Sequence, residues 1–144
     1  MPKADRRPLR IIVAPDSLKG SLSARAAAAA IATGLHQALP DAILDIQPLA
    51  DGGEGTLDIL VEALGARKES ATVHDPLGRP ITANWGWEPT SKTAIIEMAQ
   101  ASGLHLVSPA ERDLWNATSY GTGELISLAM ERNPRHIIIG LGGT

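Results

Sequence analysis

The sequence predicts an α/β protein in which helices cover the faces of a parallel sheet, followed by part of a second α/β lobe. Short runs of β-branched residues alternate with longer helical patterns in the first part of the chain, as in parallel sheets covered by helices. Farther along, two strand patterns flank a turn that contains Pro and Gly, which predicts a hairpin. This change of pattern indicates a second structural region.

The first part of the chain is expected to alternate strands and helices. Two β-branched runs predict strands, and an alanine-rich stretch and an apolar stripe predict helices. Ser23 is expected to cap the first helix and Pro40 to end it, whereas Gly65 is expected to end the second. In chain order, these elements are a strand at 9–14, a helix at 24–39, a strand at 43–48 and a helix at 57–64.

The second part begins with the hairpin, whose strands are expected at 70–74 and 81–88. Trp85 and Trp87 fall on one face of the second strand, so we expect both in the core. Ser108 lies three residues before Glu111, with Pro between them at the first helical position, which is the pattern of a capping box. The remaining elements are expected to be a strand at 93–98, a short helix from 108, a helix at 122–132 and a strand at 136–140.

Composition excludes several classes of function. The formal net charge is −3 and only 3% of the residues are aromatic, which argues against nucleic-acid binding. The chain has no Cys, so disulfides, thiolate catalysis and Cys-based metal sites are excluded. No apolar run approaches the ~20 residues of a membrane helix. We therefore expect a cytoplasmic protein with neither a nucleic-acid nor a membrane partner.

The first polar loop follows the first strand and offers Asp16, Ser17, Lys19 and Gly20 within a few residues. Lys19 would supply a mobile positive charge, and Gly20 would let backbone amides approach a phosphate or a small acid. The alternative is a capped helix start beside a solvated lysine. The loop lacks the spacing of a Walker A motif.

The second polar loop, residues 51–56, places Asp51 and Glu54 among three glycines. These carboxylates would ligate Mg²⁺, bind substrate hydroxyls or accept a proton. Asp and Gly are also good turn formers, so a simple turn is the alternative. Because ligands bind at the carboxyl ends of strands in open α/β sheets, this loop and the other two are expected to face one crevice.

The third polar loop, residues 118–124, leads into a helix and has Gly121 and Gly123 on either side of Thr122. Free amides and hydroxyls at a helix start suit a phosphate, although a capped helix explains the pattern too. Position 126 is Ile, so the Gly-x-Gly-x-x-Gly fingerprint is absent and a Rossmann dehydrogenase is disfavoured.

Other chemistry-bearing residues are scattered along the sequence. The four histidines have no metal-ligand spacing and are expected to be ordinary surface or core residues. Glu97 ends an apolar strand, which suits either a functional role or a pairing with a helix terminus.

Six segments carry a more specific signal. In chain order they are Ala14–Ser21 (APDSLKGS), Pro48–Thr56 (PLADGGEGT), Asp75–Pro80 (DPLGRP), Ile96–Leu104 (IEMAQASGL), Ala117–Ile126 (ATSYGTGELI) and Ile139–Gly143 (IGLGG). Together, and in this order, they resemble the type I family of bacterial glycerate kinases. Leu18 stands where the family usually has Phe, and Thr144 where it often has Ser.

The resemblance implies ATP- and Mg²⁺-dependent phosphorylation of D-glycerate, with 2-phosphoglycerate as the expected product. It also implies a Rossmann-like lobe beginning within residues 1–75, and the hairpin and start of a second α/β lobe within residues 76–144. Family members are considerably longer, so we expect this chain to be the N-terminal portion of such a kinase and to lack part of the site. The alternative is a non-catalytic nucleotide- or anion-binding α/β fragment.

Phosphoryl transfer depends mainly on positioning and on charge neutralisation, which suggests roles for the loop residues. We expect Lys19, with Arg79 as a second candidate, to neutralise an anionic ligand. Asp16, Asp51 and Glu54 are expected to orient hydroxyl groups or Mg²⁺, and the base is left unassigned. The further candidates for contact with substrate or phosphate are Ser17, Gly20, Gly52, Gly53, Ser119, Thr122, Gly142 and Gly143.

Overall fold

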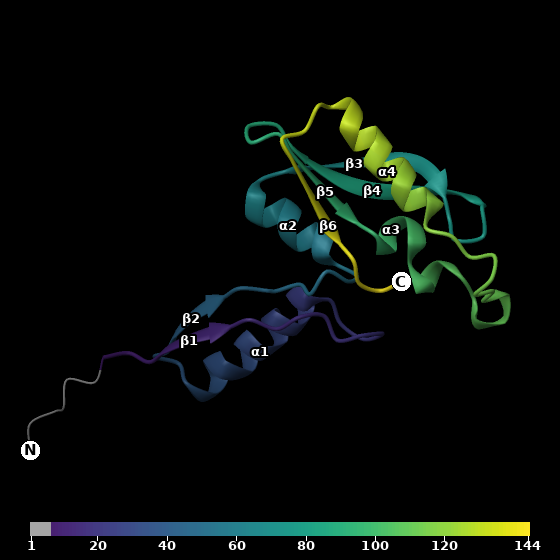
Figure 1. Ribbon diagram of the computed structural model, residues 1–144. Helices are drawn as coiled ribbons and strands as arrows, with labels where there is room; N and C mark the ends of the chain where they lie inside the picture. Colours follow the sequence, from purple (N-terminus) through teal and green to yellow (C-terminus); the bar gives the residue numbers. More distant parts are fainter. Residues whose placement is uncertain (1–6) are drawn as a thin grey trace, which may run out of the picture. The chain divides into compact units, whose positions relative to one another are not determined.

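The computed structural model describes residues 7–144 and divides into two compact units, Met1–Leu49 and Ala50–Thr144 (Figure 1). The sequence predicted a boundary between residues 75 and 76. That point lies in the turn of a hairpin whose two strands pair along their whole length, so it falls within one sheet. The α/β class is as predicted, and each unit contains at least one helix and a parallel strand pair.

The first unit is a two-stranded parallel sheet with one helix. It contains β1 (Arg10–Val13), α1 (Ala24–Ala38) and β2 (Ile43–Ile46). The buried residues of α1 are all alanines, so this helix packs through small side chains, as its composition predicted. The hydroxyl of Ser23 accepts a hydrogen bond from the amide of Ala26 at 3.2 Å and caps the helix as expected.

The second unit is built on a four-stranded mixed sheet with the strand order β3-β4-β5-β6. Its strands are β3 (Arg67–His74), β4 (Pro80–Glu88), β5 (Thr93–Glu97) and β6 (His136–Gly140). β4 is antiparallel to both of its neighbours, whereas β6 is parallel to β5. Consequently β3, β5 and β6 all run in the same direction, and their carboxyl ends lie at one edge of the sheet.

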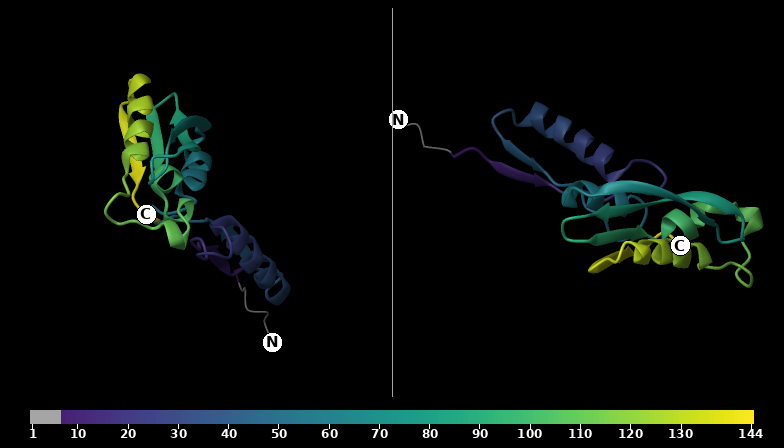
Figure 2. Two further views of the ribbon diagram at one scale, coloured as in Figure 1. Left: turned by 90° about the vertical axis from the view of Figure 1, so that its right-hand side faces the viewer. Right: turned by 90° about the horizontal axis from the view of Figure 1, so that it is seen from above.

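Helices cover both faces of this sheet (Figure 2). They are α2 (Thr56–Leu64), α3 (Ala99–Ser102), the 3₁₀ turns Leu104–Leu106 and Pro109–Glu111, and α4 (Tyr120–Glu131). A Cβ atom at Gly86 of β4 would lie 2.9 Å from Val61 of α2, whereas its neighbours Trp85 and Trp87 belong to the core that includes Leu125 of α4. Because side chains alternate along a strand, α2 and α4 lie on opposite faces.

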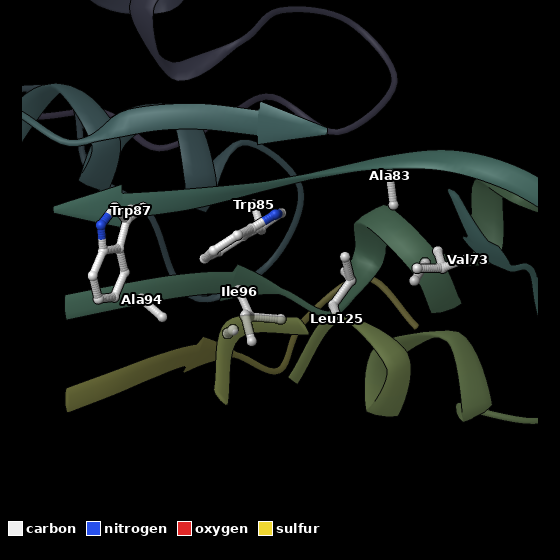
Figure 3. Packing of buried hydrophobic residues seen from close by; sticks show 9 residues of the cluster. Val73, Ala83, Trp85, Trp87, Ala94, Ile96 and Leu125 are labelled. Atoms are coloured by element: carbon white, nitrogen blue, oxygen red, sulfur yellow. The ribbon is translucent and has the colours of Figure 1, made fainter. Parts of the chain in front are cut away.

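The core of the second unit lies between the sheet and α4. One cluster of buried side chains contains Trp85 and Trp87 of β4, Ile96 of β5 and Leu125 of α4, and Trp87 lies beside Ala94 within it (Figure 3). All five side chains are buried, which confirms the expectation for the two tryptophans. The apolar stripe of α2 packs against the other face of the same sheet. This helix therefore belongs to the second unit although it follows β2 in sequence.

Local signals located most elements within a few residues. Gly65 ends α2 in the left-handed conformation with φ of 64°, as predicted from its position. The capping box of Ser108 and Glu111 is present, but it starts a single 3₁₀ turn rather than a longer helix. α4 begins at Tyr120, two residues before the predicted start.

Candidate active site

One edge of the four-stranded sheet gathers most of the polar segments that the sequence singled out. His74, Glu97 and Gly140 end the three strands that run in the same direction. The hydrogen bond from the Leu57 amide to Glu97 places the start of α2 at this edge, and a contact between Gly121 and the His74 carbonyl places the start of α4 there. Ligands of α/β proteins bind at such edges, so this is the candidate site of the second unit.

Two glycine-rich loops pack backbone against backbone at this edge. The amide of Gly142 donates to the carbonyl oxygen of Gly52 at 2.8 Å. A Cβ atom at Gly142 would lie 2.6 Å from the Gly53 nitrogen, and one at Gly140 would lie 2.8 Å from the Gly52 oxygen. Glycine is therefore required by the close approach of the loops. The structure brings together the predicted residues Gly52, Gly53, Gly142 and Gly143.

Both carboxylates of the second loop are at the surface. An oxygen of Asp51 accepts a hydrogen bond from the Gly53 amide at 2.8 Å, which fixes the turn. Oε1 of Glu54 lies 3.4 Å from Nδ1 of His105, and both side chains are about half exposed. The second oxygen of each carboxylate makes no protein contact that the structure describes, so both groups are available to a cation or a hydroxyl.

Glu97 is buried and supports the second loop from below. Its Oε2 accepts hydrogen bonds from the amides of Gly55 at 3.2 Å and of Leu57 at 2.8 Å. Gln100 donates to its other oxygen at 3.3 Å. Because the N-cap residue of α2 is Gly55, which has no side chain, Glu97 satisfies the first amides of this helix. Of the two roles left open for Glu97, the structure shows the pairing with a helix terminus.

The third loop has one predicted residue at the surface and one inside. Ser119 is exposed, and its carbonyl oxygen accepts from the amides of Thr122 at 3.0 Å and Gly123 at 3.3 Å. Thr122 is buried, and its hydroxyl lies 2.7 Å from that of Ser102. The Thr122 hydroxyl thus already has a partner within the protein, which leaves Ser119 as the better placed of the two for a ligand.

Arg79 is held by protein groups at each of its three side-chain nitrogens. Nε lies 2.6 Å from Asp75, Nη1 lies 2.8 Å from Glu111, and Nη2 donates to the Leu106 carbonyl at 3.2 Å. The hydrogen bond to Asp75 raises the pKa of Arg79. These contacts tie the hairpin turn to the segment after α3. Of the two predicted cations, Arg79 is therefore less available to a ligand than Lys19.

Burial acts to raise the pKa of Asp75. Hydrogen bonds from the amide and side chain of Arg79 and from the Leu77 amide lower this pKa by more than burial raises it. The net pKa of Asp75 is therefore below its ordinary value. Oδ1 accepts from the two amides at 2.9 and 2.8 Å, so this carboxylate builds the hairpin turn from within. The sequence indicated the turn through Pro and Gly, but not this ion pair.

A histidine and a glutamate meet at the end of β3. The backbone amide of His74 donates to Oε2 of Glu124 at 2.8 Å, and Nδ1 of its ring lies 3.0 Å from both carboxylate oxygens. The bond from the His74 amide is the main cause that lowers the pKa of Glu124. The ring of Tyr120 lies 5.9 Å from the His74 ring. The sequence predicts an ordinary surface or core histidine at position 74, since no local spacing links His74 to a residue 50 positions away.

The first polar loop lies in the other unit, between β1 and α1. An oxygen of Asp16 accepts from the Ser17 amide at 2.6 Å, and Lys19 is exposed. Gly20 adopts the left-handed conformation with φ of 70°. The loop stands at the carboxyl end of β1, where the sequence placed it. Its meeting with the other loops in one crevice stays a prediction.

Among residues 7–144, no three His, Asp or Glu side chains lie close enough to form a metal site without other ligands. None of the helices in this described part is long and apolar enough to cross a bilayer.

The fold is that of an α/β protein with polar and glycine-rich loops at the carboxyl ends of its parallel strands. Residues 11–144 match the family model described as the glycerate kinase family, and the chain belongs to this family. It is 48% identical to glycerate 2-kinase of Escherichia coli K12 over 136 residues, and 47% identical to glycerate kinase of Bacillus subtilis 168 over 136 residues. A crystal structure of putative glycerate kinase 2 from Salmonella typhimurium LT2 matches with a TM-score of 0.75 and 48% identity.

The chain corresponds to only part of these longer proteins. Each alignment with the two curated relatives covers 94% of this chain and 36% of the relative. The match to the crystal structure covers 96% of this chain and 37% of that one. The resemblance noted in the sequence is thus confirmed over nearly all of the 144 residues.

Proposed function

We propose that the protein is a glycerate kinase, which transfers the terminal phosphoryl group of ATP to a hydroxyl group of D-glycerate and gives 2-phosphoglycerate. The observation that carries this proposal is the family match over residues 11–144, which includes every polar loop described above. A cytoplasmic location and small-molecule partners, ATP and D-glycerate, accompany the proposal. Relatives that match along nearly the whole chain carry names of the same activity.

The loops offer the groups that this reaction needs. Phosphoryl transfer requires cations and amides around the phosphates and anchors for the substrate hydroxyls. Lys19 and the amides near Gly20 would neutralise an anionic group, while Asp16 would orient a hydroxyl. At the edge of the second unit, Ser119 and the Gly142–Gly143 turn would contact phosphate or polar groups.

Magnesium would fit a site of partial protein coordination. Mg²⁺ commonly takes one or two carboxylates together with phosphate oxygens and waters, rather than a complete set of protein ligands. Asp51 and Glu54 are exposed carboxylates on one loop, which suits that arrangement. When bound, the ion would neutralise charge on the nucleotide phosphates.

The activity is tested by a coupled assay of ADP release with D-glycerate and Mg-ATP, using the chain as its gene encodes it. We expect turnover that depends on both substrates, and phosphorus NMR of the product should show the phosphate on the 2-hydroxyl group. ADP release no higher than in an enzyme-free control would contradict the proposal. Binding of ATP without any turnover would favour the alternative of a non-catalytic nucleotide-binding protein.

Replacing Lys19 tests the cationic group of the first loop. Lys19→Ala should lower kcat/KM by about 10²-fold or more if its charge stabilises the transferred group, with little effect on stability because the side chain is exposed. Lys92→Ala is the matched control, because Lys92 is also an exposed lysine and precedes the start of β5, whereas the candidate site of the second unit lies at the other end of that strand. Equal kcat/KM for both variants would remove Lys19 from the site.

A further inference from the structure

We propose that His74 accepts the proton of the substrate hydroxyl during phosphoryl transfer, and that Glu124 is the residue that positions it. This inference rests on the proposed kinase activity and assigns the base that the sequence left open.

The contacts of His74 are those of an oriented base. Glu124 lies within 3.0 Å of Nδ1 through both of its oxygens. A carboxylate at this place favours the tautomer that carries its proton on Nδ1, which leaves the lone pair on Nε2. No hydrogen bond to Nε2 is found within residues 7–144, and the side chain is 44% exposed. The basic nitrogen is therefore open to a ligand.

The backbone around His74 is fixed as well. Its amide is bound by the same glutamate at 2.8 Å. Its carbonyl oxygen contacts the first turn of α4 so closely that a Cβ atom at Gly121 would lie 1.8 Å from it. On the other side, the buried Asp75 locks the following turn. A histidine held from three directions keeps its ring in one place, which is the preorganisation that proton transfer requires.

The position of the pair connects it with the rest of the candidate site. His74 ends β3, and Gly140 ends β6, which runs in the same direction. Both ends therefore lie at the sheet edge that carries the glycine-rich loops. Glu124 belongs to the segment Ala117–Ile126, one of the six that carry the family resemblance.

The imidazole of His74 suits this role better than the carboxylates of the second loop. Among residues 7–144, Nε2 of His74 has no hydrogen-bond partner, so it can accept a proton without the loss of a protein contact. Asp51 already accepts a hydrogen bond from Gly53, and Glu54 is paired with His105. These two are more useful as ligands of a cation.

The hydroxyl proton moves to Nε2 of His74 as the hydroxyl oxygen forms a bond to the γ-phosphorus of ATP. The bond between this phosphorus and the β,γ-bridging oxygen breaks, and ADP leaves with the electron pair. The ionised Glu124 stabilises the imidazolium, which then releases its proton to water.

The test compares four variants of the gene-encoded chain in the ADP-release assay. His74→Asn retains an N–H donor close to the place of Nδ1 and removes the basic nitrogen. We expect kcat to fall by about 10²- to 10⁴-fold, with KM for D-glycerate changed little. Glu124→Gln should lower kcat by about tenfold or more. His74→Ala should regain activity on addition of imidazole, and His136→Asn is the control, since His136 begins β6 at the opposite edge.

The outcomes separate the two proposals. If the unmodified chain has no turnover, the proposed function fails. If it turns over and His74→Asn keeps kcat within about threefold, or if imidazole restores nothing to His74→Ala while thermal unfolding shows it folded, His74 is not the base. If His74→Asn does not fold, the same comparison with His74→Gln decides, because Gln also lacks a basic nitrogen.

Discussion

Asp75 is a buried carboxylate that holds the hairpin turn together through several contacts. The carboxylate of Asp75 is 2% exposed, yet it accepts two amide hydrogen bonds and an ion pair. Burial disfavours its charge, and the hydrogen bonds from Arg79 and Leu77 more than offset this effect, so the pKa of Asp75 lies below its ordinary value of 3.8. Folding and ionisation of this residue are therefore linked.

The linkage predicts a loss of stability in acid. A carboxyl with a lowered pKa in the folded state stabilises the protein above its unfolded pKa, and that contribution disappears as the pH falls through the folded value. We expect urea unfolding at pH 7 to show that Asp75→Asn is less stable than the unmodified chain, with a difference that shrinks below about pH 4. A difference that stays constant down to pH 2 would contradict the linkage.

Gly121 offers a second test at the level of one residue. Because a Cβ atom there would lie 1.8 Å from the His74 carbonyl oxygen, Gly121→Ala forces the backbone of β3 or α4 to shift. We expect a loss of about 1–3 kcal/mol in urea unfolding. Gly123→Ala is the control, since nothing lies within 4 Å of its Cβ position. Alanine at this helical position should raise the free energy of unfolding by about 0.5–1 kcal/mol. Similar effects of both substitutions would refute the close contact.

The start of α2 depends on a partner that is distant in sequence. Its N-cap residue is a glycine, so the first amides rely on Glu97, which lies 40 positions away from Leu57. The helix is only nine residues long, and helices this short are marginal without tertiary support. Loss of Glu97 would therefore loosen both the helix and the loop that carries Asp51 and Glu54.

Two substitutions of Glu97 test this support. Glu97→Ala should destabilise the protein by about 1–3 kcal/mol, because the amides of Gly55 and Leu57 lose their acceptor. Glu97→Gln should cost less, since its amide oxygen can still accept both bonds. Hydrogen exchange of the Leu57 amide should speed up most in Glu97→Ala. If the glutamine variant loses as much stability as the alanine variant, the cap is not the main role of this residue.

Signals within a few positions predicted the element ends well. The caps at Ser23, Gly65 and Ser108 depend on neighbouring residues, so the sequence contains all the information. The division into units could not be predicted in this way. The structure divides after Leu49 because α2 packs against β4 and β5, and such packing between distant segments leaves no local signal. Pairs such as His74 with Glu124 are 50 positions apart, and no spacing rule reaches that far.

At the scale of the whole molecule, the two units differ in how much of each strand is buried. All five residues of β5 are buried in the four-stranded sheet, whereas β1 has a single buried residue and β2 has none. Apolar side chains in the first unit remain exposed, such as Ile12 at 70%. Burial is the main source of local stability, so the units should open with different ease.

Hydrogen exchange of the 144-residue chain measures this difference. We expect the amides of β5 to be the slowest to exchange, because opening them requires disruption of the core around Trp85 and Ile96. The amides of β1 and β2 should exchange at least about tenfold faster. Equal protection in both sheets would show that burial of these strands does not determine local stability.

The backbone hydrogen bond from Gly142 to Gly52 joins two loops of the second unit that are 90 positions apart in the sequence. The same hydrogen bond ties the end of β6 to the loop before α2, so it forms only after the residues between them have folded. A larger side chain at either glycine would keep these two loops apart in a sheet that has otherwise formed.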